Sequence, residues 1–164
     1  MDTSPKVRAQ RITQYEQGPA RLKQALAQVP DAAVQWRPAP ERWSAHEIVC
    51  HCADAEVNAA ARIRFLLAEK DPVIVGYDQE EWARTFDYHA HPLDAALQTV
   101  ESVRANTAAL IKRLPQSAWE KEGRHTESGR YTAEDWLRIY ADHLEGHARQ
   151  IEKNVAAWQE GKDR

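Results

Sequence analysis

The sequence has few of the features that mark membrane-spanning, secreted or nucleic-acid-binding proteins. No hydrophobic run approaches the length of a membrane span, and the polar segment 1–10 lacks the apolar core of a signal peptide. The 22 lysines and arginines do not exceed the 25 acidic residues, and they are dispersed along the chain rather than clustered. We therefore expect a cytoplasmic protein that binds neither a membrane nor a nucleic acid.

Cysteine is also scarce, with only Cys50 and Cys52 in the chain. Residues two apart on a helix point to different sides, so we expect no disulfide between them. One residue separates the pair, which is not the Cys-x-x-Cys spacing of redox motifs and zinc fingers. We expect both thiols to fill small apolar spaces in a core; the alternative is that one of them lies near a functional site.

The sequence is rich in hydrophobic residues, which make up 43% of its 164 positions and recur at helical spacing. This amount suits a single domain over residues 1–164 with a full-sized core. Helices are expected from Pro5 to about Val29, from Ser44 to Asp71-Pro72, from Leu93 to Leu114 and from Tyr131 to Glu160. Because no convincing strand lies between them, we predict an all-α helical bundle, whose helix order in space the pattern does not give.

Capping signals mark the starts of these helices. Ser44 and Glu47 form a Ser-x-x-Glu capping box, the clearest of these signals. Within the first helix, Gly18-Pro19 removes one backbone hydrogen bond, so a kink or a short break is expected there. The expected N-cap residues are Ser4, Ser44, Asp78 and Thr132.

The segments between the long helices are expected to be mostly irregular. Residues 36–42 are proline-rich and extended, and residues 78–86 fit a short helix. Residues 73–75 are too short to found a sheet, and residues 120–130 are rich in glycine, serine and charge. We expect an extended lid at the first of these two segments and a loop at the second.

The last helix carries two histidines, His143 and His147, on its apolar stripe. Four residues correspond to about 400° of helix rotation, so both imidazoles project in the same direction. An unpaired imidazole is costly on a buried face, and a shared metal ion is one partner that satisfies both rings. Separate bonds to a carboxylate or a carbonyl would satisfy them as well. The intervening residues do not form His-Glu-x-x-His, so a zinc-protease site is not indicated.

A third histidine, His51, lies on the inner flank of the second helix. Facing helices of bundles build metal sites in their cores, and three neutral imidazoles leave one coordination position open, as in catalytic sites. An ion held in this way turns a water or a thiol into a nucleophile at neutral pH. We expect His46 in the exposed first turn of the second helix and leave it out of the site. The His-x-His pair of His89 and His91 could chelate a metal ion in an extended chain, but a loop pair before a proline is more often solvent-facing, so we expect both outside the site.

Four residues are candidates for a general base beside such an ion: Asp54, Glu56, His125 and Asp142. We expect Asp54 and Glu56 to be surface charges of the second helix. Asp142 is expected to orient a ligand imidazole. His125 is a candidate only if its loop folds over the site.

Several segments resemble the DinB/YfiT-like family. Trp43 to His51, followed by Asp54 and Glu56, resembles the family signature W-S-x-x-E-x-x-x-H-x-x-D-x-E. The segment 140–151 resembles its closing H-x-x-x-H-x-x-Q-I motif. Further segments that resemble the family are Trp36-Arg37-Pro38 and Tyr77-Asp78 with Trp82. The likeness therefore extends over nearly the whole chain.

The resemblance implies an antiparallel four-helix bundle, usually a homodimer, that binds a divalent metal ion through His51, His143 and His147. Zinc and nickel both suit imidazole ligands. Activities in the wider family include thiol-dependent transfer and isomerisation, as in bacillithiol transferases and mycothiol-dependent maleylpyruvate isomerase. Many members are named only as metal-dependent hydrolases.

We therefore expect a metal-dependent transferase or hydrolase. In it the ion activates a low-molecular-weight thiol or a water for reaction with a small-molecule substrate. One alternative is a non-catalytic, stress-associated metal-binding dimer. Another is a structural bundle whose three histidines are unrelated core residues. No residues in the sequence identify a thiol-binding site.

Overall fold

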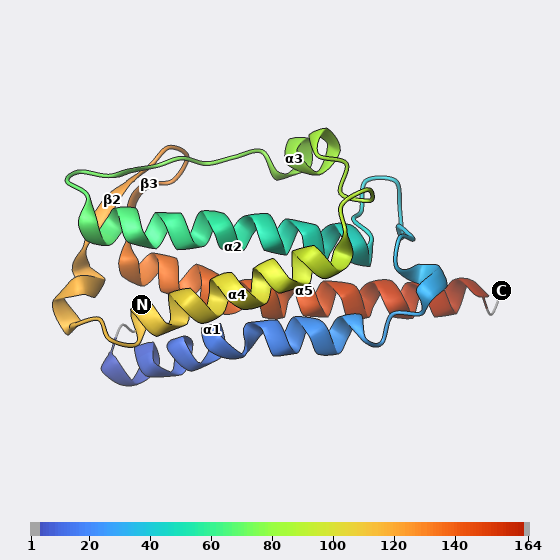
Figure 1. Ribbon diagram of the computed structural model, residues 1–164, viewed down its shortest axis with the longest axis horizontal. Helices are drawn as coiled ribbons and strands as arrows, with labels where there is room; N and C mark the ends of the chain where they lie inside the picture. The colour runs from blue at the N-terminus through green and yellow to red at the C-terminus, as the bar shows by residue number, and fades with distance from the viewer. Residues whose placement is uncertain (1–3, 163–164) are drawn as a thin grey trace.

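Four long helices lie side by side and form the body of the molecule (Figure 1). In the computed structural model, which describes residues 4–162, they are α1 (Pro5–Leu26), α2 (Ala45–Ala68), α4 (Leu93–Ile111) and α5 (Ala133–Lys162). Helix α1 packs mainly against α5 and α2 mainly against α4, while α2 with α5 and α1 with α4 close the bundle. In Figure 1, α1 and α5 run in one direction and α2 and α4 in the other. The predicted four-helix bundle is confirmed.

A small three-stranded sheet lies beside the C-terminal end of α2 (Figure 1). Strand β1 (Val73–Ile74) is parallel to β2 (Glu122–His125), which is antiparallel to β3 (Gly129–Thr132). Residues 73–75 were expected to be extended but too short to form part of a sheet, and residues 120–130 were expected to form a loop; the absence of a sheet and the loop were therefore wrong. Both strands of the hairpin are short and polar, so they lack the alternation that marks a strand. The turn between them depends on Gly129, whose φ of 80° favours glycine.

The expected helix starts are confirmed by their capping bonds. Oγ of Ser44 accepts from the backbone N–H of Glu47 at 3.2 Å, and Oε2 of Glu47 accepts from the N–H of Ser44 at 2.9 Å. Oγ1 of Thr132 accepts from the N–H of Asp135 at 3.0 Å before α5. The short helix α3 (Gln79–Thr85) starts after its Asp78 cap. Two 3₁₀ turns, η1 (Asp31–Ala33) and η2 (Gln116–Glu120), complete the connections.

Helix α1 continues through Gly18 and Pro19, so of the two expectations, a kink or a short break, the break is absent. The helix ends at Leu26 rather than near Val29. Pro19 has no N–H to donate to the carbonyl of Tyr15 four residues earlier. Nη1 of Arg104, from α4, donates to that carbonyl instead, at 2.8 Å. Gly18 makes room for the guanidinium, because a Cβ at this position would lie 2.6 Å from Nη1 of Arg104. The pair thus accommodates a buried arginine.

The hydrophobic core forms two groups, one at each end of the bundle. Leu22, Ile48, Val100, Leu144 and Ile151 belong to the group at the N-terminal end of α2. The group at the other end includes Tyr15, Ile63, Ile111, Trp136 and Leu137. Among residues 4–162, no helix is long and apolar enough to cross a membrane.

Candidate metal centre

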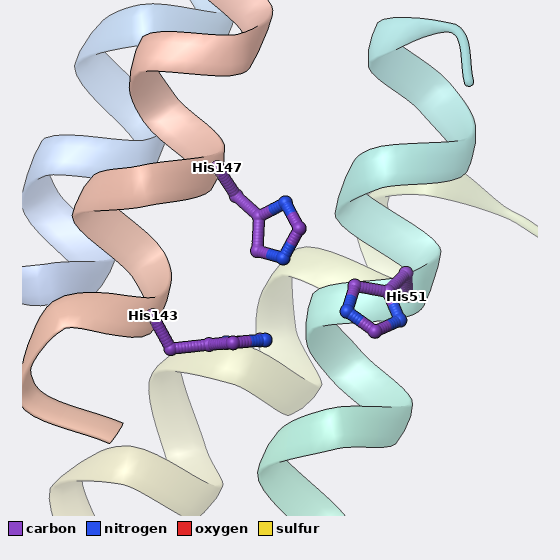
Figure 2. A group of neighbouring side chains, drawn as sticks. All are labelled: His51, His143 and His147. Atoms are coloured by element: carbon purple, nitrogen blue, oxygen red, sulfur yellow. The ribbon is translucent and has the colours of Figure 1, made fainter. Parts of the chain in front are cut away.

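Three imidazoles from two helices meet at the interface between α2 and α5. His51 comes from the second turn of α2, and His143 and His147 come from successive turns of α5. One ring nitrogen of each points toward a common space (Figure 2), and these nitrogens all lie within 4.8 Å of one another. The ring centroids are 5.4 Å apart for His51–His143, 4.8 Å for His51–His147 and 4.6 Å for His143–His147. The helix rotation inferred from the sequence produces this convergence.

The hydrogen bonding of the three rings is incomplete. Nδ1 of His51 and Nδ1 of His143 are buried and have no hydrogen-bond partner within residues 4–162. Nδ1 of His147 lies 3.0 Å from Oε1 of Gln150, one turn further along α5. This contact fixes the Nδ1–H tautomer of His147, since the amide oxygen can only accept, and leaves its other nitrogen as a lone-pair donor.

The rings are held in their neutral form. Burial lowers the pKa of His51 to about 3, with a smaller contribution from His147. Burial also lowers the pKa of His143 well below its ordinary value, with smaller contributions from His147, His51 and Arg104. Burial lowers the pKa of His147 as well, although its bond to Gln150 acts in the opposite direction. Neutral imidazoles repel a cation far less than imidazolium ions and can donate a lone pair to it.

The chemistry of this donor set fits a divalent transition metal. Three neutral nitrogens form the protein part of a catalytic zinc-type site, with one position left for a small ligand. A tetrahedral ion with bonds of about 2.0–2.1 Å holds two nitrogens closer together than 4.8 Å, so modest ring rotation is needed to bind it. Among residues 4–162, Nδ1 of His51 and Nδ1 of His143 have no partner that would fix the tautomer of either ring.

Aromatic side chains border the cluster, one from the segment just before α2 and one from α5. The ring of Trp43, just before α2, lies 4.8 Å from that of His51, and Tyr140 lies 5.9 Å from His143. The backbone carbonyl of Trp43 accepts a bond from Nδ2 of Asn154 at 2.9 Å, which ties the start of α2 to α5. The low polarity of these walls accounts for the desolvation that lowers the histidine pKa values.

The four general-base candidates have other partners than the three histidines. Asp54 accepts a bond from the hydroxyl of Tyr88 at 2.6 Å. Asp142 is exposed and accepts from Nε2 of Gln14 at 2.8 Å, while the ring of His147 is held by Gln150 rather than by Asp142. His125 lies in β2 of the hairpin, where its Nδ1 accepts from the backbone N–H of Glu127 at 3.2 Å.

Glu56 is not the surface charge that we expected. It is fully buried and forms an ion pair with Arg104, which is also fully buried. Nη2 of Arg104 also donates to the carbonyl of Tyr140 at 3.0 Å. The sequence analysis did not single out Arg104, because no residue near it in the chain indicates that it is buried. The one hint in the sequence is the Gly18-Pro19 pair in α1, which makes room for the guanidinium and leaves it a free carbonyl.

The remaining histidines lie outside the cluster, as expected, but His46 is not exposed. Its side chain is buried, and its Nε2 lies 2.8 Å from the carbonyl oxygen of His91. Nε2 of His89 lies 2.8 Å from Oγ of Ser44. The connection that leads into α4 folds back over the first turn of α2 and buries His46 there.

Comparison with known proteins gives a family and a set of relatives. The model of the DinB superfamily matches residues 14–151. "Putative metal-dependent hydrolase OB0782" of Oceanobacillus iheyensis is 28% identical over 140 residues, which cover 85% of this chain and 81% of that protein. YfiT of Bacillus subtilis, which has the same descriptive name, is 26% identical over 85% of this chain and 79% of its own length.

Solved structures share the fold. YfiT from Bacillus subtilis, described as having an unusual four-helix bundle topology, superposes with a TM-score of 0.89 and 23% identity, covering 96% of this chain and 91% of that one. The mycothiol-dependent maleylpyruvate isomerase superposes with a TM-score of 0.71 and 14% identity. That match covers 88% of this chain but only 60% of the isomerase. At these identities the likeness shows the fold alone.

Proposed function

The chain belongs to the DinB superfamily, and we propose that it is a divalent-metal-dependent enzyme whose ion is bound by His51, His143 and His147. The observation that carries this proposal is the convergence of three ring nitrogens within 4.8 Å. The neutral state of the rings supports it. So do the names of the relatives, which describe metal-dependent hydrolases. We propose zinc or nickel as the ion, because imidazole suits both.

When bound, the divalent ion supplies an open coordination position and makes a water or a thiol more acidic there. The chain's own residues prepare this position. Gln150 fixes the tautomer of His147, so that the ring presents a lone pair rather than a proton. Trp43 packs on the ring of His51 and excludes water from one side of it. Burial keeps the rings of His51 and His143 unprotonated at neutral pH.

The reaction that we propose is hydrolysis of a small molecule, or transfer of a low-molecular-weight thiol to it. The names of the relatives favour water as the nucleophile. The fold shared with the mycothiol-dependent isomerase is the reason to test a thiol as well. Small-molecule substrates, a cytoplasmic location and a homodimeric state are part of the same proposal.

The test is an activity assay with defined metal content. Metal-free protein is reloaded with zinc or nickel and assayed for hydrolysis of small esters and amides, and for consumption of a thiol in the presence of a small electrophile. We expect activity only in the reloaded protein, and a loss of at least about 100-fold in kcat/KM for His51→Ala and His147→Ala. The control is His91→Ala, since His91 is an exposed histidine outside the cluster.

The outcomes separate the proposal from its alternative. Equal activity with and without the ion would contradict metal-dependent catalysis. Stoichiometric metal without turnover in either assay would favour the non-catalytic metal-binding protein. The carboxylates favour that alternative, because Asp54 accepts a hydrogen bond from Tyr88 and Asp142 accepts one from Gln14, rather than from a cluster histidine.

A further inference from the structure

A hollow of about 440 Å³ lies next to the histidine cluster, between α5 and the connection that leads into α2. Small-molecule sites commonly occupy about 300–1,000 Å³, so its size suits a small ligand. Among the residues that the structure describes, Arg42, Arg149 and Lys153 line the hollow and no carboxylate does. The chain as a whole has a net charge of −3, so the sign of charge is reversed locally.

Two of these three positive charges are uncompensated. Nη1 of Arg149 pairs with Oε1 of Glu145 at 2.8 Å, at the edge of the hollow. Arg42 and Lys153 are exposed and form no ion pair with any residue in the range 4–162. A concave surface lined by unpaired charges of one sign concentrates ligands of the opposite sign.

The walls of the hollow are continuous with the walls of the histidine cluster. Gln150 lines the hollow and contacts Nδ1 of His147 at 3.0 Å. Asn154 lines it as well and bonds to the carbonyl of Trp43, whose ring packs on His51. The hollow and the cluster therefore adjoin at Gln150 and Asn154, while Arg149 and Lys153 line the hollow further around α5.

The spacing along α5 sets the size of a ligand that reaches both places. Gln150 follows His147 by about 4.5 Å of helix rise and Lys153 follows it by about 9 Å. An anionic group in the hollow would thus lie about 5–10 Å along the helix from the cluster. Lys153 also lies about 120° around α5 from His147, so a ligand that reaches both places has to extend past Gln150.

We propose that this hollow binds the anionic group, a carboxylate or a phosphate, of the small molecule on which the histidine site acts. Arg42 and Lys153 attract and hold that group, and Gln150 marks the boundary to the reacting end. The assignment of the reacting end rests on the proposed function. Anion binding in the hollow does not, because none of its cations belongs to the cluster.

The first arm of the test uses inorganic phosphate and metal-free protein, so that binding cannot arise from an ion. Phosphate is titrated calorimetrically into the wild type, into Arg42→Gln/Lys153→Gln and into a control, Lys70→Gln/Lys121→Gln. The control removes two exposed lysines at the opposite end of α2. We expect the Kd to rise about tenfold in the first double variant and to be unchanged in the control. Added salt should weaken binding in the wild type.

The second arm tests whether the hollow serves the histidine site. Protein loaded with one equivalent of paramagnetic Co²⁺ should speed the ³¹P relaxation of phosphate, and the effect should disappear in Arg42→Gln/Lys153→Gln while Co²⁺ stays bound. Equal phosphate affinity in all three proteins of the first arm would overturn the anion site. Phosphate binding with no relaxation effect from bound Co²⁺ would overturn its link to the cluster. If the protein does not bind Co²⁺, the proposed function is contradicted. The anion site is then judged by the phosphate titrations of the first arm alone, because these use metal-free protein.

Discussion

The imidazole of His51 is protonated much less readily than that of an ordinary surface histidine. Its side chain is 1% exposed, and burial lowers its pKa to about 3. A group whose pKa is lower in the folded state than in the unfolded state binds fewer protons when folded, so acid favours unfolding. This property suits a metal ligand, since protons then compete poorly for the lone pair.

We expect metal-free protein to lose stability as the pH falls below about 6.5, the ordinary pKa of histidine. The loss continues toward the lowered pKa of His51, and each excluded proton contributes about 1.4 kcal/mol per pH unit in that window. Above it the contribution is constant. Urea unfolding of the wild type and of His51→Ala at about pH 7.5 and about pH 5.5 measures the difference in slope. The same pH dependence in wild type and variant would contradict the account.

The two cysteines are buried on either side of His51, as expected for small apolar fillers. Burial raises the pKa of Cys50 to about 12 and that of Cys52 well above its ordinary value. The thiolate is the form that binds metals and reacts with electrophiles. At neutral pH neither thiol therefore competes with the imidazoles for an ion.

We expect neither cysteine of the folded protein to react readily with iodoacetamide. At pH 8, a thiol with a pKa of about 12 has about one molecule in 10⁴ ionised. Mass spectrometry after a short exposure should find unmodified folded protein and a doubly alkylated product in urea. Rapid labelling of Cys50 without urea would show that its thiol is more exposed or more acidic than the structure indicates.

Between the two apolar groups of the core, a polar layer joins the four long helices. Arg104 from α4 pairs with Glu56 from α2 and donates to carbonyls of Tyr15 in α1 and Tyr140 in α5. Its guanidinium carbon lies 3.9 Å from the ring centroid of Tyr15. Tyr140 lies about one helical turn before His143, so the bond from Arg104 to its carbonyl holds α5 in place next to the histidine cluster.

We expect Glu56→Gln to destabilise the protein by about 3–5 kcal/mol, because it leaves the charge of Arg104 buried and unpaired. Replacing both partners, as Glu56→Gln/Arg104→Met, should cost less than the sum of the two single variants. Urea unfolding at neutral pH gives the free energies, with Glu145→Gln as a control for an exposed ion pair. A loss below about 1 kcal/mol for Glu56→Gln would show that the layer contributes little.

The features that could be predicted from the sequence are those that depend on residues close together in the chain. The capping box at Ser44 and Glu47 and the common face of His143 and His147 depend on helix geometry alone, and both are present. Glu56 was misjudged because its partner is 48 residues away on another helix. The hairpin was missed for a similar reason, since β2 is held in part by β1, a strand far away in the chain.

At the level of the whole molecule, the order of the helices is what assembles the site. Contact between α2 and α5 brings His51 to two histidines about 90 residues later in the chain. Neither helix alone supplies three ligands, so a metal ion that binds all three stabilises the folded bundle over the unfolded chain.

The central claim is that these three histidines hold one divalent ion, and elemental analysis of untagged protein tests it most directly. Wild type, His51→Ala, His147→Ala and the control His91→Ala are purified in parallel and analysed after reconstitution with zinc or nickel. We expect about one equivalent of metal in the wild type and in the control, and loss of that metal in both cluster variants. Wild-type protein that retains no metal after reconstitution with either ion would contradict the account.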